Sequence, residues 1–161
     1  MQLRRLRRGD EEALTANAND RDVWRNVRDR FPHPYNLGDA AWWIANSGET
    51  HFGIEVDGVI AGCIGFDRDE DVFRLSAEIG YWLGRNYWGK GIATAAVSTL
   101  TDRVFATTDI VRLYAGVFEW NAASARVLEK SGYVFEGRKK RAVVKDGQLI
   151  DELLYAKVKP A

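Results

Sequence analysis

The chain has 161 residues and a mass of 18.2 kDa, and 46% of its residues are hydrophobic and 29% are charged. A folded chain of this size buries about two thirds of the surface that it exposes when unfolded, which supports one core and argues against intrinsic disorder. The 23 basic and 23 acidic residues cancel, so the chain lacks the basic excess with which nucleic-acid-binding proteins neutralise phosphates. We therefore expect no nucleic-acid partner. Because no run of 18 apolar residues is present, we also expect no membrane partner and a cytoplasmic location.

The chain has one cysteine, Cys63, and two histidines, His33 and His51. A single cysteine cannot form an internal disulfide, and these residues are too few for a structural zinc site. Cys63 lies in an apolar run over residues 59–66, where we expect a small buried thiol and not a nucleophile. We therefore predict no metal cofactor.

The first third of the chain has helical patterns after one short strand, and no composition break or repeat divides residues 1–161, which we expect to form one domain. Asp10 is a capping residue followed by acidic residues, which favours a helix start, and the strand before it is expected to turn its arginines to solvent. A second helical pattern begins at Asp20 and must end before Pro32. The expected elements are a strand over residues 3–6 and helices after Asp10, over 20–31 and over 39–46.

From residue 50 the pattern changes to strands. The pair Asp57-Gly58 between two apolar runs is the strongest hairpin signal in the chain, and Asp146-Gly147 predicts another turn. The expected elements are strands over 51–56, 59–66, 75–83, 111–119, 133–136 and 149–158, a solvated loop over 67–71, and helices over 92–105 and 121–130. This order predicts an α+β or mixed α/β fold, in which helices cover the faces of a sheet.

Residues 85–91 form a glycine-rich segment between a predicted strand and a predicted helix. Unpaired main-chain N–H groups converge at a helix N-terminus, where the helix dipole is positive, so such a segment can bind phosphate. Gly89 and Gly91 let the backbone approach an anion closely, and Lys90 adds a positive charge. An ordinary tight turn explains the glycines equally well.

The spacing of residues 84–90 also fits a nucleotide-binding P-loop up to its last position. Gly91 stands at that position, where a P-loop needs a Ser or Thr hydroxyl to ligate magnesium. Tyr87 and Trp88 would also crowd a phosphate cradle. A magnesium-dependent nucleotide hydrolase is therefore the least favoured function.

The glycine-rich loop is one part of a wider pattern. Residues 88–93 (WGKGIA) resemble the acetyl-coenzyme A (acetyl-CoA) pyrophosphate loop of the GCN5-related N-acetyltransferase (GNAT) superfamily, in the RimJ/RimL-like branch of ribosomal-protein N-terminal acetyltransferases. Residues 78–83 (EIGYWL), 121–124 (NAAS) and 127–133 (VLEKSGY) are similar to that branch in order and spacing. Trp88 departs from the Arg or Gln that usually opens the loop. The resemblance implies a single GNAT-like domain whose mostly antiparallel twisted sheet has helices on both faces and a splayed strand pair.

The resemblance also implies an acetyl-CoA-dependent N-acetyltransferase, in which a primary amine attacks the thioester directly. The ammonium must lose a proton, and the departing thiolate must be protonated or stabilised. Ser124 is the residue expected to serve the thiolate, with Tyr133 as the alternative acid. Glu78 is the candidate base, with Glu119 and Glu152 as lesser candidates. The residues expected to hold the cofactor are Trp82, Leu83, Trp88, Gly89, Lys90, Gly91, Ile92, Ala93, Thr94 and Asn121.

Each of these roles has a structural alternative that the sequence leaves open. Asn121 is also expected as a helix cap, Ser124 as an exposed helical serine, and Glu78 as a strand-end charge that faces solvent or pairs with an arginine. Trp82 and Leu83 would pack in a sheet in either case. A non-catalytic acyl-CoA-binding sensor therefore remains the alternative function.

The acceptor is expected to be a peptide or protein N-terminus or a small amine. An α-amine with a pKa near 7.8 needs about 1 kcal/mol to be neutral at pH 7, whereas a lysine amine of pKa about 10.4 needs roughly 4.6 kcal/mol. An α-amine can therefore use a weaker base. The early helices and residues 31–35 are expected to form the acceptor pocket, which Trp24, Trp42 and Trp43 either line or support from the core. Monomer and homodimer both remain open.

Overall fold

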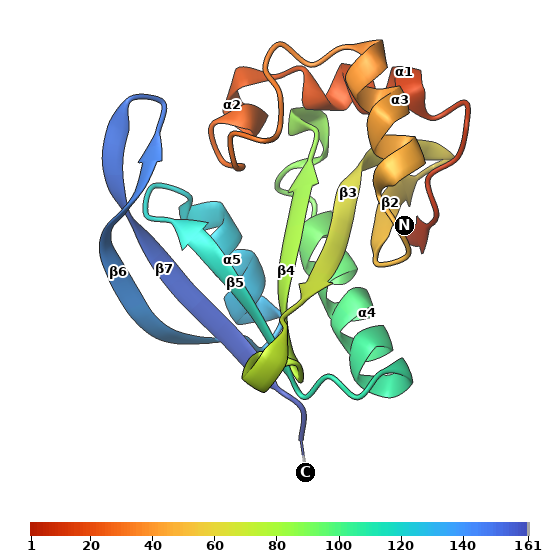
Figure 1. Ribbon diagram of the computed structural model, residues 1–161. Coiled ribbons are helices and arrows are strands. Elements are labelled where there is room, and N and C mark those ends of the chain that lie inside the picture. Colours follow the sequence, from red (N-terminus) through yellow and green to blue (C-terminus); the bar gives the residue numbers. More distant parts are fainter. Residues whose placement is uncertain (161) are drawn as a thin grey trace.

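The computed structural model describes residues 1–160, which contain one seven-stranded sheet in the order β1-β2-β3-β4-β5-β7-β6 (Figure 1). Neighbouring strands are antiparallel except β4 and β5, which are parallel. Within these residues no helix has the length and hydropathy needed to cross a membrane. In chain order the elements are β1 (Gln2–Arg4), α1 (Glu11–Ala18), α2 (Arg21–Trp24), α3 (Leu37–Asn46), β2 (His51–Val56), β3 (Val59–Arg68), β4 (Ser76–Leu83), α4 (Ile92–Thr107), β5 (Arg112–Phe118), α5 (Ala122–Lys130), β6 (Val134–Lys145) and β7 (Gln148–Val158).

Helices cover both faces of the sheet, as the resemblance implies. Leu100 of α4 and Leu128 of α5 are fully buried in the main core, against strand residues such as Leu113. Leu14 of α1 packs with Cys63 of β3 in a second core, to which α3 also contributes. Cys63 is thus the buried core residue that its apolar surroundings predict, and burial raises the pKa of its thiol to about 12.

The parallel pair β4 and β5 stays together for only three residues of each strand. Ser76–Glu78 pair with Arg112–Tyr114, and the two strands then diverge (Figure 1). Beyond this point β4 continues to pair with β3, and β5 continues to pair with β7. We call the unpaired stretch, residues 79–83 of β4 and 115–118 of β5, the splay. Its presence confirms the splayed strand pair.

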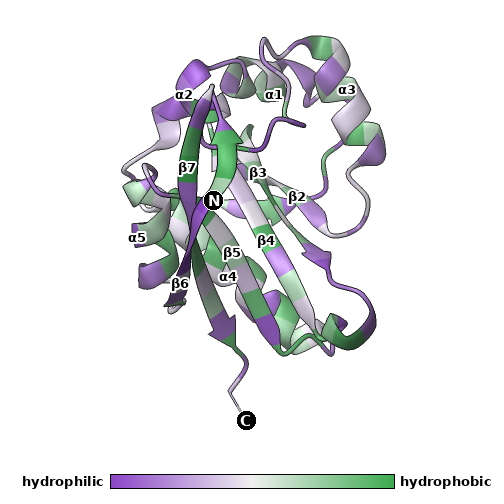
Figure 2. Ribbon diagram, turned by 60° about the vertical axis from the view of Figure 1, so that its left-hand side comes forward, coloured by the Kyte–Doolittle hydropathy of each residue, from purple (hydrophilic) through white to green (hydrophobic). Residues whose placement is uncertain are grey.

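The turn and strand signals are largely confirmed. Asp57 and Gly58 have φ of 50° and 82°, the left-handed conformations of a two-residue hairpin turn, and Asp146-Gly147 repeats this pattern between β6 and β7. Hydrophobic and hydrophilic residues alternate along β4 (Figure 2). Ile79 is therefore buried against the helices, whereas Glu78 is on the opposite face and only half-buried.

The helix predicted over residues 20–31 is wrong in extent, because α2 ends at Trp24. After it, the N–H groups of Asn26 and Val27 donate to carbonyls three residues back, at 3.1 and 3.2 Å, and the Asn26 amide donates to the Asp22 carbonyl at 2.9 Å. These local bonds compete with a regular helix. The Asp20 carboxylate caps the short helix instead of starting a long one.

Four further expectations need correction. The strand predicted over residues 133–136 continues to Lys145, because register irregularities near Gly137 and after Lys139 hide its alternation, and β3 likewise extends to Arg68 at the start of the expected loop. Arg4 is not on a solvated face, since its guanidinium binds the Asp10 carboxylate at 2.8 Å and also pairs with Glu55. Asp10 therefore stands before α1 without capping it.

Candidate functional site

The glycine-rich loop is anchored to the end of β4 by Trp88. The Trp88 indole N–H donates to the Leu83 carbonyl at 2.8 Å, and the Trp88 main-chain N–H donates to the Arg85 carbonyl at 3.1 Å. Both N–H groups of Trp88 are therefore used within the loop. Trp88 shapes the loop, and the free main-chain donors begin at the next residue.

The main-chain N–H groups of residues 89–94 donate to no acceptor within the described residues 1–160. The first main-chain bond of α4 runs from Ala95 N–H to the Gly91 carbonyl at 3.0 Å. Gly89 and Gly91 have φ of 71° and 73°, and a Cβ atom added at either would meet no atom within 4 Å. Open space thus lies beside six consecutive donors at a positive helix end, which is the arrangement that binds phosphate. Lys90 is exposed at the edge of this loop.

The first turn of α5 faces the splay from the other side. Asn121 caps this helix as predicted, because its side-chain oxygen accepts a hydrogen bond from the Ser124 N–H at 3.1 Å. Its side-chain nitrogen has no acceptor within residues 1–160. It therefore remains available as a donor.

The Ser124 side chain is hydrogen-bonded to Tyr81 of β4, a residue that the sequence analysis did not predict for the site. The two side-chain oxygens are 2.8 Å apart, and the Tyr81 hydroxyl lies 3.3 Å from the Ser124 carbonyl oxygen. This contact joins β4 to α5 across the splay. Burial raises the pKa of Tyr81 above its ordinary value. Its place on the same face of β4 as the buried Ile79 and Leu83, opposite to Glu78 and Trp82, was the one signal that could have found it.

Glu78 lies at the end of the paired part of β4, opposite Tyr114, where the splay begins. Its carboxylate pairs with the Arg28 guanidinium from the segment after α2. Burial raises the pKa of Glu78 above its ordinary value, and the negative charges of Glu152 and Asp67 add to this effect. Arg28 opposes the shift and favours the ionised form. The predicted ion pair and the predicted position beside the splay are thus both present.

The alternative acid and bases are engaged elsewhere. The Tyr133 hydroxyl is 2.8 Å from the Thr101 hydroxyl in the main core, and the Tyr133 side chain is buried. Glu119 binds Arg138 at 3.2 Å and accepts the Asp151 N–H at 3.0 Å. No side-chain hydrogen bond of Tyr133 or Glu119 within residues 1–160 reaches β4.

Glu152 is the second carboxylate that acts on the site, because its charge affects Glu78. It pairs with Lys139 at 2.8 Å and lies over Gly116, where a side chain would collide with it. Its charge raises the pKa of Glu78, so the two carboxylates influence each other. Glu152 therefore contributes to the electrostatics of the site even though its own carboxylate is held by Lys139.

The predicted acceptor-side aromatics separate into three environments. Trp24 stacks on His33 at 5.5 Å between ring centroids, Trp43 packs in the second core, and Trp42 is exposed over 64% of its surface. Phe31, from the predicted loop, packs edge-on against Trp82 of β4 at 5.3 Å. Trp24 and Phe31 are thus the early aromatics placed near this end of β4.

Two segments far apart in sequence meet at the open end of the splay. The tip of the β6–β7 hairpin lies beside α2 (Figure 1), where Lys145 Nζ binds Asp29 at 2.7 Å and Arg21 binds Asp146 at 2.9 Å. Lys145 is 1% exposed and its ammonium lies 3.8 Å from the centroid of the Trp24 ring. We call this group of contacts the hairpin contact.

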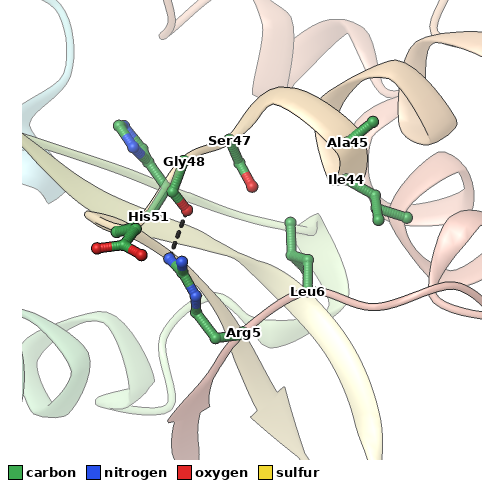
Figure 3. Close-up of a pocket in the computed structure, with 8 residues that line it drawn as sticks. Arg5, Leu6, Ile44, Ala45, Ser47, Gly48 and His51 are labelled. Carbon is green, nitrogen blue, oxygen red and sulfur yellow. Dashed lines mark hydrogen bonds between the residues drawn. The ribbon is translucent and has the colours of Figure 1, made fainter.

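A separate pocket of about 260 Å³ lies between the end of α3 and the segment after β1 (Figure 3). The Arg5 guanidinium points into it and donates to the Gly48 carbonyl. None of the candidate site residues lines this pocket. Among residues 1–160 we find no group of three or more His, Cys, Asp or Glu side chains suited to a metal ion.

Comparisons with known proteins identify the family of the chain. A family model described as an acetyltransferase (GNAT) domain matches residues 1–134. The uncharacterized N-acetyltransferase p20 of Bacillus licheniformis is 39% identical over 65% of this chain and 58% of its own length. The ribosomal-protein-serine acetyltransferase of Escherichia coli is 30% identical over 62% of this chain and 55% of its own length.

The solved structure of Mycobacterium smegmatis RimJ in complex with CoA-disulfide superposes with a TM-score of 0.85 at 27% identity, and covers 97% of this chain and 80% of that one. The matched segment spans less than two thirds of the length of the two curated relatives. Because the family model covers most of the chain, the chain belongs to the GNAT acetyltransferase domain family, in its RimJ/RimL-like branch.

Proposed function

We propose that this protein transfers an acetyl group from acetyl-CoA to a primary amine. The amine nitrogen forms a bond to the acetyl carbon, the carbon–sulfur bond breaks, and the nitrogen loses a proton. The observation that carries the proposal is the run of free N–H groups at residues 89–94 beside the splay. A diphosphate on these donors would leave the remainder of the coenzyme along β4, with its thioester between the diverging strands.

The loop and α5 supply the groups that hold the cofactor. Gly89 to Thr94 offer main-chain donors, and Lys90 adds charge at the rim. The free side-chain nitrogen of Asn121 is a further donor near the Ser124 hydroxyl. Trp82 and Leu83 form the β4 edge along which the acyl arm would lie. The complex of RimJ with a CoA-disulfide supports binding of a coenzyme A by a similar fold.

Glu78 is the proposed base. A carboxylate removes a proton only when it is ionised, and Arg28 keeps the pKa of Glu78 lower than burial alone would set it. A carboxylate remains a weak base for a lysine amine, whose neutralisation costs several kcal/mol, whereas an α-amine needs about 1 kcal/mol at pH 7. We therefore infer a peptide or protein N-terminus as the preferred acceptor, ahead of a small amine.

The test is a screen of N-terminal peptides and small amines with acetyl-CoA, read by mass spectrometry. We expect a mass gain of one acetyl group on α-amines, and a strong loss of this product in Ser124→Ala. Binding of acetyl-CoA without acetylation of any amine would instead indicate an acyl-CoA sensor. ATP binding in place of acetyl-CoA binding would contradict both functions.

A further inference from the structure

We propose that Tyr81 is a positioning residue for acyl transfer, whose hydroxyl donates to Ser124 Oγ and leaves the serine hydrogen free to point at the thioester sulfur. The inference rests on the proposed function, in which Ser124 serves the departing thiolate. It adds a second residue, Tyr81 on β4, which orients the serine on α5 across the splay.

The geometry restricts how the Ser124 hydroxyl can be used. Tyr81 Oη lies 2.8 Å from Ser124 Oγ. If the serine donated to the tyrosine, its single hydrogen would be spent and could not reach the sulfur. If the tyrosine donates to Oγ, the nearer acceptor, instead of to the Ser124 carbonyl oxygen at 3.3 Å, the serine oxygen is satisfied as an acceptor and its hydrogen can turn to a second partner. A negative charge developing on sulfur favours the second arrangement, because it attracts the serine hydrogen.

The chain of two hydroxyls stabilises charge without losing a proton of its own. Burial raises the pKa of Tyr81, whereas an alkyl thiol such as cysteine has a pKa of about 8.5. Transfer of the tyrosine proton to the thiolate is therefore unfavourable, and both hydroxyls keep their protons. The electron pair of the carbon–sulfur bond leaves on sulfur, the nitrogen proton passes to Glu78, and the thiolate takes its proton from solvent. Aligned hydrogen bonds of this kind reinforce one another.

The tertiary structure supports an oriented contact. Tyr81 packs against the main core, and Ser124 is in the first turn of α5, where Asn121 holds its N–H. Two rigid elements on opposite sides of the splay thus set the distance between the two hydroxyls. A purely structural contact would have the same appearance, so the test must separate orientation of Ser124 from stability.

The chain offers a control in Tyr155 of β7. Its hydroxyl donates to the Glu129 carboxylate of α5 at 3.2 Å, so it also joins a strand to this helix. Tyr81→Phe and Tyr155→Phe therefore each remove one hydroxyl that bridges the sheet and α5, and only the first contacts Ser124. Thermal unfolding measures the structural effect of each change, for which we expect similar shifts in Tm.

Steady-state kinetics then test the role of Tyr81. We expect Tyr81→Phe to lower kcat by about 10- to 100-fold, the lower part of the range for an assisted proton or charge transfer, with the KM for acetyl-CoA within about twofold. Tyr155→Phe should keep kcat within about twofold. In the double variant Ser124→Ala/Tyr81→Phe, kcat should equal that of Ser124→Ala, because Tyr81 acts only through the serine.

Four outcomes would overturn the inference. An unchanged kcat in Tyr81→Phe, while Ser124→Ala is impaired, would overturn this inference alone. So would losses that multiply in the double variant, or a rise confined to KM, because each indicates a structural role. Absence of turnover in the unmodified protein on every amine tested would overturn the proposed function, and the role of Tyr81 with it.

Discussion

The side of the splay where we propose that acetyl-CoA binds, the cofactor side, offers main-chain N–H donors of one continuous segment, residues 89–94. The side where we propose that the amine binds, the acceptor side, is held by side chains from segments more than 100 residues apart, Asp29 with Lys145 and Arg21 with Asp146. Main-chain donors do not depend on side-chain identity, so they suit a constant group such as a diphosphate. Side-chain contacts change with single substitutions, which suits a surface that selects among amines.

The largest effect is expected from a substitution on the cofactor side, at Gly91 of the glycine-rich loop. Gly91→Glu places a side chain in the left-handed conformation, which costs about 1–2 kcal/mol, and puts a negative charge in the space beside the free donors. Two like charges about 4 Å apart near a surface repel by about 4 kcal/mol. We expect acetyl-CoA affinity to fall by at least ~100-fold, measured by calorimetry.

Gly91→Ala is the control for this change, because it keeps the backbone strain and adds no charge. Its loss of affinity should be much smaller than that of Gly91→Glu. Equal binding of acetyl-CoA by the unmodified protein and Gly91→Glu would show that the coenzyme does not use this loop.

The second largest effect, on kcat, is expected at the proposed base Glu78, which lies where the splay begins. Glu78→Gln should lower kcat by about 10²-fold. Since burial raises the pKa of Glu78 and the base acts when ionised, kcat/KM should fall as the pH drops through that pKa, above the usual carboxyl range. Arg28→Gln removes the charge that favours ionisation, so this acid limb should move to higher pH.

The pH profile of kcat/KM, measured for both variants with the same amine, separates Glu78 from the acceptor. The ionisation of the amine is common to all the enzymes compared, so only a difference between their profiles reports the carboxylate. The limb assigned to Glu78 should be missing in Glu78→Gln. Identical profiles in all three enzymes would assign the proton transfer to another group.

The smallest effect is expected at the hairpin contact. Asp29→Asn leaves the buried Lys145 ammonium without its anionic partner, although the exposure of Asp29 reduces the cost below that of a fully buried pair. We expect a loss of about 1–2 kcal/mol in the free energy of unfolding by urea. Adding Lys145→Met should recover part of it, because an apolar side chain replaces the unpaired charge.

The same two variants distinguish the sides of the splay. Acetyl-CoA affinity should stay within about twofold, while the KM for the acceptor rises as the segment after α2 loosens. A parallel loss of acetyl-CoA affinity would mean that the two sides are not independent. A double variant less stable than Asp29→Asn would contradict the buried-charge explanation.

Local signals predicted much of the fold and the cofactor side of the site. The Asp57-Gly58 turn, the Asn121 cap and the loop before α4 depend on residues a few positions apart, so their patterns can be seen in the chain itself. Resemblance to a known family added the splay, which no local pattern reveals. The roles of the individual site residues remain proposals.

The mistaken expectations have both local and distant causes. The α2 helix ends early, at Trp24, because local hydrogen bonds of the next residues replace its regular pattern. Arg4 was expected in solvent, but it pairs with Asp10 and with the distant Glu55. Lys145 is buried despite its charge because Asp29, more than 100 residues away, pairs with it, which residue propensity does not predict.

The order of turns, caps and glycines in the chain by itself determined where most of the strands and helices form and where a row of main-chain donors is left free. Only the tertiary structure decided that Tyr81 meets Ser124 across the splay and that Lys145 is covered by Asp29 and Trp24. The physical reason is range: backbone conformation is set by neighbours within a turn, whereas the partner of a polar side chain is set by which elements pack together.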